Sequence, residues 1–532
     1  MDGSHFRDEA AVVPLLTTPA VRKLGAGDWI GFAAMAFGMF MALLDIQIVS
    51  SSLAEIQSGL AAGSDEISWV QTSYLIAEVV MIPLSGFLSR VLATRVLFTL
   101  SAASFTVMSL ACGFAWNLES MIAFRAAQGF LGGAMIPTVF ATAFTLFPPE
   151  KRAGVGVLIG LIATAAPTLG PTVGVYLTEA FSWHWLFFIN CVPGIAVAIA
   201  VWTLIDVDRP NLSLLKGFDY PGLASMALFL GSLEYVLEEG PRYDWFEDRV
   251  ILTLAVTCAV AGVLFLWRMF TYRNPIVELR AFADRNFAVG SLYSFILGIG
   301  LYGSVYVVPL YLARVRGFNS LQIGEVMFVT GFFQMLSAPI AGALSKKLDL
   351  RLMLALWLAL FGIGVYLTSF MTAEWGFLEL MMPQAVRGSS LMLCFIPINT
   401  LALGTLPPEK LKNASGLYNL MRNLGGAIGL AAINTVITSR QQFHWNRLGA
   451  AVNPGRGVVR SFIDTMSAHV TGLLPGDPDK AAMKELAQIV YREATVLTLN
   501  DVLLLMAAVF AVALMFMPLV RKPQTAEPIG AH

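Results

Sequence analysis

The sequence predicts an all-α polytopic membrane protein with fourteen transmembrane helices, built as two six-helix halves with two extra central helices. Three observations predict this fold. Apolar residues make up 57% of the 532 positions and charged residues only 13%, against about 25% in a soluble domain. Apolar segments of about 20 residues recur along the whole chain, and each is long enough to cross a bilayer as a helix. Short sequence elements also recur in the same order in both halves.

The apolar segments define the spans and the organisation of the chain. The spans are predicted at 28–50, 67–89, 96–115, 119–140, 154–178, 184–205, 219–238, 250–271, 288–313, 323–344, 352–372, 377–404, 414–439 and 497–519. They divide the chain into a cytoplasmic segment 1–27, an N-terminal six-helix bundle 28–206, two extra helices with linkers 207–285, a C-terminal six-helix bundle 286–519 with a periplasmic loop 440–496, and a cytoplasmic tail 520–532.

The distribution of Lys and Arg predicts that both termini are cytoplasmic. With the termini inside, most basic residues fall in cytoplasmic segments, as the positive-inside rule expects. The basic residues of the short outer loops are Arg242, Arg249, Arg314 and Arg316. The segment 440–496 holds further basic residues, but long loops count little in this rule. An odd number of spans would move half of the basic loops outside, so the asymmetry favours an even number.

Two sequence elements repeat between the halves. Pro83, Gly86, Ser89 and Arg95 recur at identical spacing as Pro339, Gly342, Ser345 and Arg351. Likewise, Pro148-Pro149-Glu150-Lys151 recurs as Pro407-Pro408-Glu409-Lys410. Two such matches in one order predict two homologous halves related by an axis along the membrane normal, which is the architecture of major-facilitator transporters. The extra helices are then 219–238 and 250–271, which lie between the halves.

Charged residues within the spans are the candidate functional groups, because a charge at the bilayer centre costs at least about 2.5–3.5 kcal/mol unless it has a partner. Asp45 lies in a polar run of the first helix and is a candidate proton carrier whose protonation depends on the side to which a cavity opens. Arg125 lies in the middle of the fourth helix and needs a carboxylate, carbonyl dipoles or water nearby. The alternatives are a packing or capping contact for Asp45 and a fixed buried ion pair for Arg125. Glu78, in an apolar part of the second helix, is a third candidate for proton coupling.

Four further residues are weaker candidates for the substrate cavity or for coupling. Gln47 belongs to the same polar run as Asp45, and Gln128 lies one helical turn from Arg125. Glu234 is close to the outer end of the first extra helix. Arg387 corresponds to Arg125 by its position before the second repeated element, and a structural pairing is also open for it.

The chain resembles the 14-helix drug:proton antiporters of the major facilitator superfamily, of the EmrB/QacA type, over residues 28–519. The residues that carry the resemblance are Leu44-Asp45-Ile46-Gln47-Ile48-Val49, Arg125-Ala126-Ala127-Gln128-Gly129, the group Pro167, Gly170, Pro171 and Gly174, Trp183-His184-Trp185, Phe187-Phe188-Ile189-Asn190, and Asp244-Trp245-Phe246. The last of these is similar to the EmrB branch in particular.

The resemblance implies proton-coupled efflux of drugs or other amphipathic compounds across the inner membrane, with the proton gradient as energy source and no cofactor. It implies coupling roles for Asp45 and Arg125, and an exporter-type fifth helix with Pro167, Gly170, Pro171 and Gly174. Proline bends a helix and glycine lets helices approach closely, so such a helix could rock between states. A proton-coupled transporter of a specific metabolite, including one for uptake, remains the alternative.

The resemblance also implies gating loops at the cytoplasmic face and an external partner. The predicted gating residues are Gly86, Arg90, Arg95, Gly342, Lys346 and Arg351. The loop after the second helix departs from the family pattern, because Ser89 and Leu92 replace an aspartate and a glycine. The outer segment 440–496 could contact a periplasmic adaptor and, through it, an outer-membrane channel. A folded cap on the outer face is the alternative.

Other function classes find little support in the sequence. The four cysteines, Cys112, Cys191, Cys258 and Cys394, are far apart and lack metal-ligand spacing, so no metal site is predicted. Nucleotide-binding loops and nucleophile motifs are missing, which argues against an enzyme. A net charge of -1 gives no reason to expect nucleic acid as a partner. The expected partners are small amphipathic substrates and the lipid bilayer.

Overall fold

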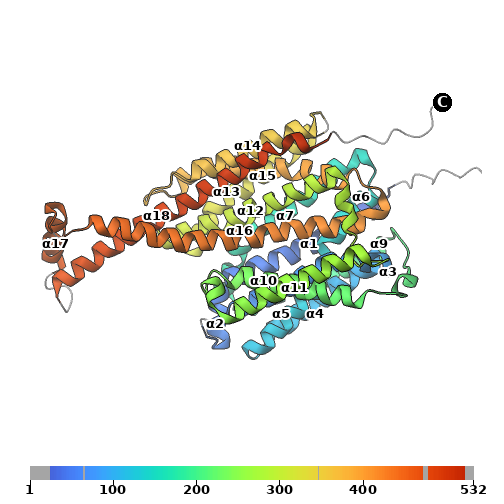
Figure 1. Ribbon diagram of the computed structural model, residues 1–532, viewed down its shortest axis with the longest axis horizontal. Coiled ribbons are helices and arrows are strands. Elements are labelled where there is room, and N and C mark those ends of the chain that lie inside the picture. The colour runs from blue at the N-terminus through green and yellow to red at the C-terminus, as the bar shows by residue number, and fades with distance from the viewer. Residues whose placement is uncertain (1–23, 64–65, 346, 454, 471–476, 522–532) are drawn as a thin grey trace, which may run out of the picture.

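The computed structural model describes residues 24–63, 66–345, 347–453, 455–470 and 477–521, and in this part of the chain it contains helices and no strand. The helices form one elongated bundle from which a helical arm projects at one end (Figure 1). This end is called the arm end. The opposite end, which carries Arg90, Arg95 and Lys412, is called the basic end.

The first half and the inserted pair contain the helices α1 (Ala26–Ser51), α2 (Leu53–Leu60), α3 (Trp69–Leu92), α4 (Thr94–Gly113), α5 (Leu118–Gly132), α6 (Met135–Leu146), α7 (Pro149–Ala180), α8 (Trp185–Phe188), α9 (Cys191–Leu204), η1 (Leu212–Leu215), α10 (Tyr220–Glu239), η2 (Trp245–Glu247) and α11 (Arg249–Thr271). The second half contains η3 (Leu279–Ala283), α12 (Arg285–Arg314), α13 (Ser320–Leu344), α14 (Leu350–Thr368), α15 (Phe377–Leu403), α16 (Pro408–Ala451), α17 (Gly457–Val470), α18 (Pro478–Met515) and η4 (Met517–Leu519).

Every predicted span corresponds to helical structure, and 13 helices of the described residues are long and apolar enough to cross a membrane. The remaining predicted span is α10, a helix of 20 residues that is less apolar because it carries Glu234, Glu238 and Glu239. Whether α10 crosses the bilayer as a fourteenth span therefore stays a prediction. The predicted fourth span is divided into α5 and α6. The short α2 was not predicted.

The packing of the two halves follows the sequence repeat. Gly86 on α3 faces the beginning of α16, and a Cβ there would lie 2.9 Å from the Asn413 Cα. Gly342 on α13, its repeat counterpart, faces α7, and a Cβ there would lie 2.8 Å from Val157. The repeated glycine of each half thus packs against a long helix of the other half. Internal symmetry, which the sequence predicted, is therefore visible in how the halves meet.

The structure changes one residue correspondence between the halves. Gly129 on α5 lies against the backbone of Tyr74, and Gly388 on α15 lies against the backbone of Thr330 in the same way. If Gly388 is the counterpart of Gly129, the residue equivalent to Arg125 is Gln384, four positions earlier. The prediction that Arg387 corresponds to Arg125 is wrong by three residues, almost one helical turn, because the sequence comparison allowed unequal spacing.

The arm is a continuation of two bundle helices. α16 has 44 residues and α18 has 38, and both run past the bundle to α17 at the tip (Figure 1). The sequence predicted a periplasmic loop at 440–496 between the last two spans. Most of this segment is helical instead, because α16 and α18 run continuously from the predicted spans into it. α18 begins after Asp477, whose carboxylate accepts a hydrogen bond from the Asp479 N–H at 3.0 Å.

Candidate functional site

A fully buried ion pair joins α1 and α5. The Arg125 guanidinium donates to the Asp45 carboxylate at 2.5 Å, and neither side chain is exposed. An unpaired charge at this depth would be costly, whereas the pair has a net charge of zero. The sequence predicted that both residues are functional, and the structure shows that each is the other's partner.

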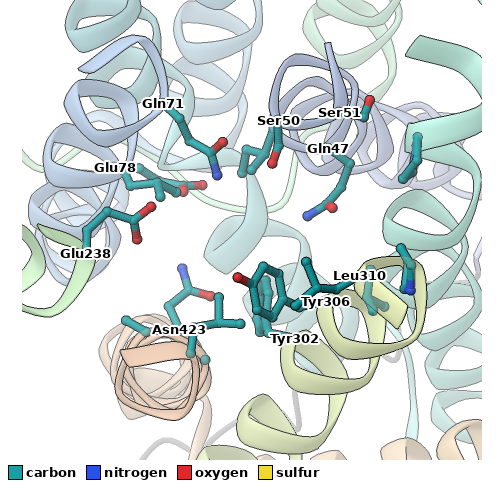
Figure 2. A pocket seen from close by; sticks show the side chains of 18 of the residues that line it. Gln47, Ser50, Ser51, Gln71, Glu78, Glu238, Tyr302, Tyr306, Leu310 and Asn423 are labelled. Atoms are coloured by element: carbon teal, nitrogen blue, oxygen red, sulfur yellow. The ribbon is translucent and has the colours of Figure 1, made fainter. Parts of the chain in front are cut away.

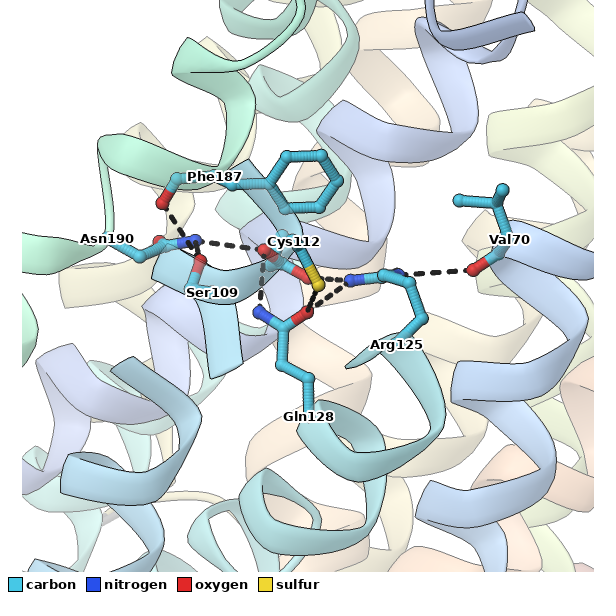
Figure 3. Close-up of polar contacts among 8 residues, drawn as sticks. Val70, Ser109, Cys112, Arg125, Gln128, Phe187 and Asn190 are labelled. Carbon is cyan, nitrogen blue, oxygen red and sulfur yellow. Dashed lines mark hydrogen bonds and ion pairs between the residues drawn. The ribbon is translucent and has the colours of Figure 1, made fainter. Parts of the chain in front are cut away.

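Two amides complete the coordination of the Asp45 carboxylate (Figure 3). Gln128 donates to it at 3.3 Å, and Asn190, just before α9, donates at 2.9 Å. Gln128 also accepts from Arg125 at 2.8 Å, so its amide bridges both charges. Asn190 donates further to Ser109 on α4 at 3.1 Å. The ionised carboxylate is thus held by donors from α5 and from the residue that precedes α9.

The guanidinium of Arg125 has partners on α3. It donates to the backbone carbonyl of Val70 at 3.1 Å and lies over the ring of Tyr74, 4.3 Å from its centroid. One of its terminal nitrogens, Nη2, is buried without a hydrogen-bond partner in the described part of the chain. A buried donor without a partner is rare in protein interiors.

The structure places Asp45 on a different face of α1 from the one the polar run suggested. Asp45 points into the first half, whereas Gln47, Ser50 and Ser51 line a cavity between the halves (Figure 2). Asp45 is not part of the cavity wall. The predicted candidates therefore lie in three places: Asp45, Arg125 and Gln128 form the buried network, Gln47, Glu78 and Glu234 line the cavity, and Arg387 lies apart from both on α15.

The cavity has a volume of about 440 Å³ and lies between α1, α3, α7 and α10 on one side and α12, α13 and α16 on the other. Glu78, Glu234 and Gln47, all predicted from the sequence, are among its lining residues. Glu238 lines it too and was not singled out. In Figure 2 the side chains of Gln71, Glu78 and Glu238 lie across the cavity from Tyr302 and Asn423. Polar groups thus converge in a mostly apolar space, which is typical of a ligand site.

The proline and glycine residues of α7 bring it against α1. A Cβ at Gly170 would lie 2.3 Å from the Gln47 Cβ, and one at Gly174 would lie 2.9 Å from the Ile48 carbonyl oxygen. Pro167 and Pro171 lie inside the helix, and Pro171 lines the cavity. The helix that the sequence singled out therefore contacts the cavity-lining face of the helix that carries Asp45.

The two halves are tied together at the basic end. Lys412, at the beginning of α16, forms an ion pair with Asp208 and donates to the Ser89 carbonyl at 2.9 Å. The side chain of Asn413 accepts from the Glu278 N–H and donates to the Glu278 carbonyl, both at 3.0 Å. Arg90 pairs with the Glu278 carboxylate at 2.8 Å. These contacts close the basic end below the cavity.

Both acidic residues of this closure lie in linkers of the inserted pair. Asp208 also accepts from the Thr94 N–H at the start of α4, at 3.0 Å. In the second half, the Asp349 carboxylate likewise accepts a hydrogen bond from the Arg351 N–H at the start of α14, at 2.9 Å. Where the family pattern has an aspartate, this chain has Ser89, and Asp208 supplies a carboxylate there instead. The sequence could not reveal this, because Asp208 is far from the motif along the chain.

The other predicted gating residues have local contacts. Arg95 lies over the ring of Trp202 on α9, 5.2 Å from its centroid, and Arg351 pairs with Asp349 at 2.9 Å. Both contacts stay within one half. Lys346 lies outside the described residues.

Arg387 is buried on α15 and donates to the Thr330 hydroxyl at 3.2 Å. In the described residues no carboxylate lies within 4.0 Å of it, so its surroundings differ from those of Arg125.

Several residues of the buried network were not predicted. Tyr74, Ser109 and Val70 had no expected role, and Asn190 was expected only as part of a motif. The sequence signal that could have identified Ser109 and Asn190 is the occurrence of these polar residues within apolar segments.

Known proteins resemble this chain over most of its length. The family model of the Major Facilitator Superfamily matches residues 35–430. Colistin resistance protein EmrB of Acinetobacter baumannii is 42% identical over 484 residues, which cover 91% of this chain and 94% of that protein. Multidrug export protein EmrB of Escherichia coli K12 is 30% identical over 484 residues, with 90% and 93% coverage.

A solved structure supports the same fold. The human organic anion transporter MFSD10 aligns with a TM-score of 0.57 at 12% identity, over 92% of this chain and 99% of that one. The family match and the near full-length relatives confirm the resemblance inferred from the sequence motifs. The chain therefore belongs to the Major Facilitator Superfamily, in its EmrB-like branch, and is a multi-pass protein of the inner membrane.

Proposed function

We propose that this protein is a proton-coupled antiporter that exports drugs or other amphipathic compounds across the inner membrane. The observation that carries the proposal is the fully buried Asp45–Arg125 pair. Asp45 belongs to α1, and the other face of α1 lines the cavity between the halves. Relatives named as multidrug export proteins support the direction of transport. With both termini cytoplasmic, the basic end faces the cytoplasm, and the closure there corresponds to an outward-facing arrangement.

The coupling step follows from the electrostatics of the pair. When Asp45 is ionised, Arg125, Gln128 and Asn190 hold its carboxylate. A proton on Asp45 removes the charge attraction and leaves Arg125 without a counter-ion. The contact of α1 with α5 then weakens, and α1 becomes free to move against α7. Because Gln47, Ser50 and Ser51 lie on the same helix, protonation of Asp45 changes the cavity wall.

Protons have a short path from the cavity to this pair. Glu78 lines the cavity and lies one helical turn from Tyr74 on α3, and the Tyr74 ring contacts Arg125. The tyrosine hydroxyl and one Glu78 oxygen are both buried without hydrogen-bond partners in the described residues. Glu78 would therefore take up a proton from the cavity first. Asp45 is the group whose change of charge alters the helix contacts.

The available driving force is sufficient. One charge that crosses 100 mV releases roughly 2.3 kcal/mol, which corresponds to about a 50-fold concentration gradient. A pH gradient adds to this.

Inside-out membrane vesicles test the proposal directly. Acidification of the lumen should drive uptake of a fluorescent amphipathic dye into vesicles that contain the protein, and addition of dye should release protons from the lumen. Vesicles without the protein are the control. Uptake that is insensitive to collapse of the proton gradient would contradict proton coupling, and dye movement only in the opposite direction would indicate an importer.

We also propose that the arm docks a periplasmic adaptor. Its support is the length of α16 and α18, which carry α17 well beyond the bundle (Figure 1). At the base of the arm, Asp501 pairs with Arg440 at 2.7 Å and His444 at 2.8 Å, so the two helices are braced where they leave the bundle. A braced projection of this kind suits a partner outside the membrane better than a cap folded onto the outer face.

Deletion of residues 453–478 should abolish co-purification of the adaptor and lower export from intact cells. Dye uptake into inside-out vesicles should persist, since the bundle and the arm base remain. The exposed Val458→Ser, within α17, serves as a milder variant. Unchanged adaptor binding and unchanged cellular export after the deletion would refute the docking role.

A further inference from the structure

The wall of the cavity has an uneven charge. Its acidic lining residues are Glu78 on α3 and Glu234 and Glu238 on α10, and Lys, Arg and His do not occur among its lining residues in the described part of the chain. Two of the three carboxylates therefore come from the inserted pair, which the two six-helix halves do not contain. Of the two cavity-lining carboxylates on α10, only Glu234 was predicted from the sequence, as a residue close to an outer end.

α10 is an integral part of this wall. Its Tyr235 ring packs against Trp69 of α3 with centroids 5.2 Å apart. After the helix, the Trp245 indole donates to the Thr435 hydroxyl of α16 at 3.1 Å. The inserted helix thus contacts α3 of the first half and α16 of the second, and it holds Glu234 and Glu238 at the gap between them.

In the part of the chain that the structure describes, the three carboxylates form no ion pair. In the described residues no basic nitrogen lies within 4.0 Å of any of them. One oxygen of Glu78, a residue that is 3% exposed, is buried without a hydrogen-bond partner. Glu234 is 7% exposed, and it lines the same cavity as Glu78 and Glu238. Buried carboxylates that repel one another are favourable only when a cation or protons offset their charge.

The opposite wall suits the rest of a cationic amphipathic molecule. Tyr302 and Tyr306 of α12 face the carboxylates across the cavity (Figure 2). The Tyr306 hydroxyl donates to Asn434 at 2.7 Å, which fixes that ring. Aromatic faces attract cations and also pack against apolar groups. Between these walls lie aliphatic side chains such as Leu75, Val79 and Leu310.

We propose that this cavity is a binding site for cationic amphipathic substrates, in which Glu234 and Glu238 of the inserted helix, together with Glu78, bind the positive group. The proposal rests on the transport function proposed above and adds the substrate class. The inserted pair then has a direct role, because it supplies two of the three groups that select for positive charge.

A matched pair of ions tests charge selection at nearly constant size and shape. Tetraphenylphosphonium and tetraphenylborate have opposite charges on similar tetraphenyl frames. Binding to the purified full-length protein in detergent is measured without a proton gradient. The wild type should bind the phosphonium more tightly than the borate. Glu234→Gln together with Glu238→Gln should weaken phosphonium binding by roughly 10- to 100-fold, because the variant loses two negative charges that attract the cation in a poorly solvated cavity. Borate binding should stay equal or become tighter.

Glutamine keeps the size of the side chain, so the double variant is expected to fold. Glu247→Gln, an exposed acid in η2 outside the cavity, is the matched control and should bind both ions as the wild type does. Unchanged phosphonium affinity in the double variant overturns the proposal. An equal loss of both ions also overturns it, because the carboxylates would then shape the cavity without selecting charge.

The binding measurement separates this proposal from the function on which it rests. Failed charge selection, with dye uptake into vesicles intact, refutes the cation site alone. Failed proton-driven uptake by the wild type, with selective phosphonium binding intact, refutes the transport function alone.

Discussion

Replacement of Asp45 by asparagine should abolish proton-driven export. Asparagine keeps the shape of the side chain but cannot release a proton, and it leaves the fully buried Arg125 without a counter-ion. Removal of one partner from a buried ion pair costs about 3–5 kcal/mol, so the variant should also unfold at lower temperature. Proton release on addition of substrate to the purified protein, together with a thermal unfolding curve, measures both effects.

Loss of export by this variant alone could reflect lost stability. The double variant Asp45→Asn with Arg125→Gln removes both charges, and amides can hydrogen-bond to one another and to Gln128 and Asn190. It should unfold nearly as the wild type does and yet show no substrate-induced proton release. If the double variant exports with normal proton dependence, the pair is a structural contact that holds the first half together, and coupling must reside elsewhere.

Gly129→Ala should separate α3 from α5 and disrupt the Asp45–Arg125 network, although Gly129 has no side chain in it. A Cβ at this position would lie 2.3 Å from the carbonyl oxygen of Tyr74, and a backbone atom cannot rotate away. The helices must then move apart, at a cost of about 1–3 kcal/mol. Arg125 lies one turn away on α5 and would lose its hydrogen bond to the Val70 carbonyl. We expect a lower unfolding temperature and strongly reduced dye uptake.

Gly154→Ala on α7 is the control, because among the described residues a Cβ there would meet no side chain and no neighbouring helix within 4 Å. Alanine in a helix is generally favourable relative to glycine by about 0.5–1 kcal/mol, so this variant should be as stable as the wild type or slightly more stable. If the two alanine variants unfold at the same temperature and transport equally well, the close approach of α3 and α5 has no functional consequence.

Much of the architecture follows from local sequence features. A helix that crosses lipid needs a long apolar segment wherever it occurs, so the spans could be located without knowledge of their neighbours. The repeat of Pro83, Gly86 and Ser89 in the second half predicted the internal symmetry, because it too can be recognised in short contiguous segments. Buried charges are rare enough in spans that Asp45, Arg125 and Glu78 could be singled out individually.

Other features depend on residues that are distant along the chain. The role of Asn190 depends on its position beside Asp45, and that of Asp208 on its position beside Lys412. The length of the arm was missed because polar residues in α16 and α18 ended the apolar pattern without ending the helices. Arg387 was matched to Arg125 by its position before the second repeated element, whereas the packing of Gly388 against Thr330 shows a different register.

The apolar segments and their repeat are enough to show a helical membrane protein of two related halves, because hydrophobic length and the repeat are properties of contiguous segments. The sequence also identified the charged residues that the bilayer makes costly. Which of these charges meet depends on how the helices pack. Asp45 and Arg125 neutralise each other inside the first half. In the described residues Glu78, Glu234 and Glu238 form no ion pair and line the cavity, because the direction and packing of each helix determine the neighbours of every charge.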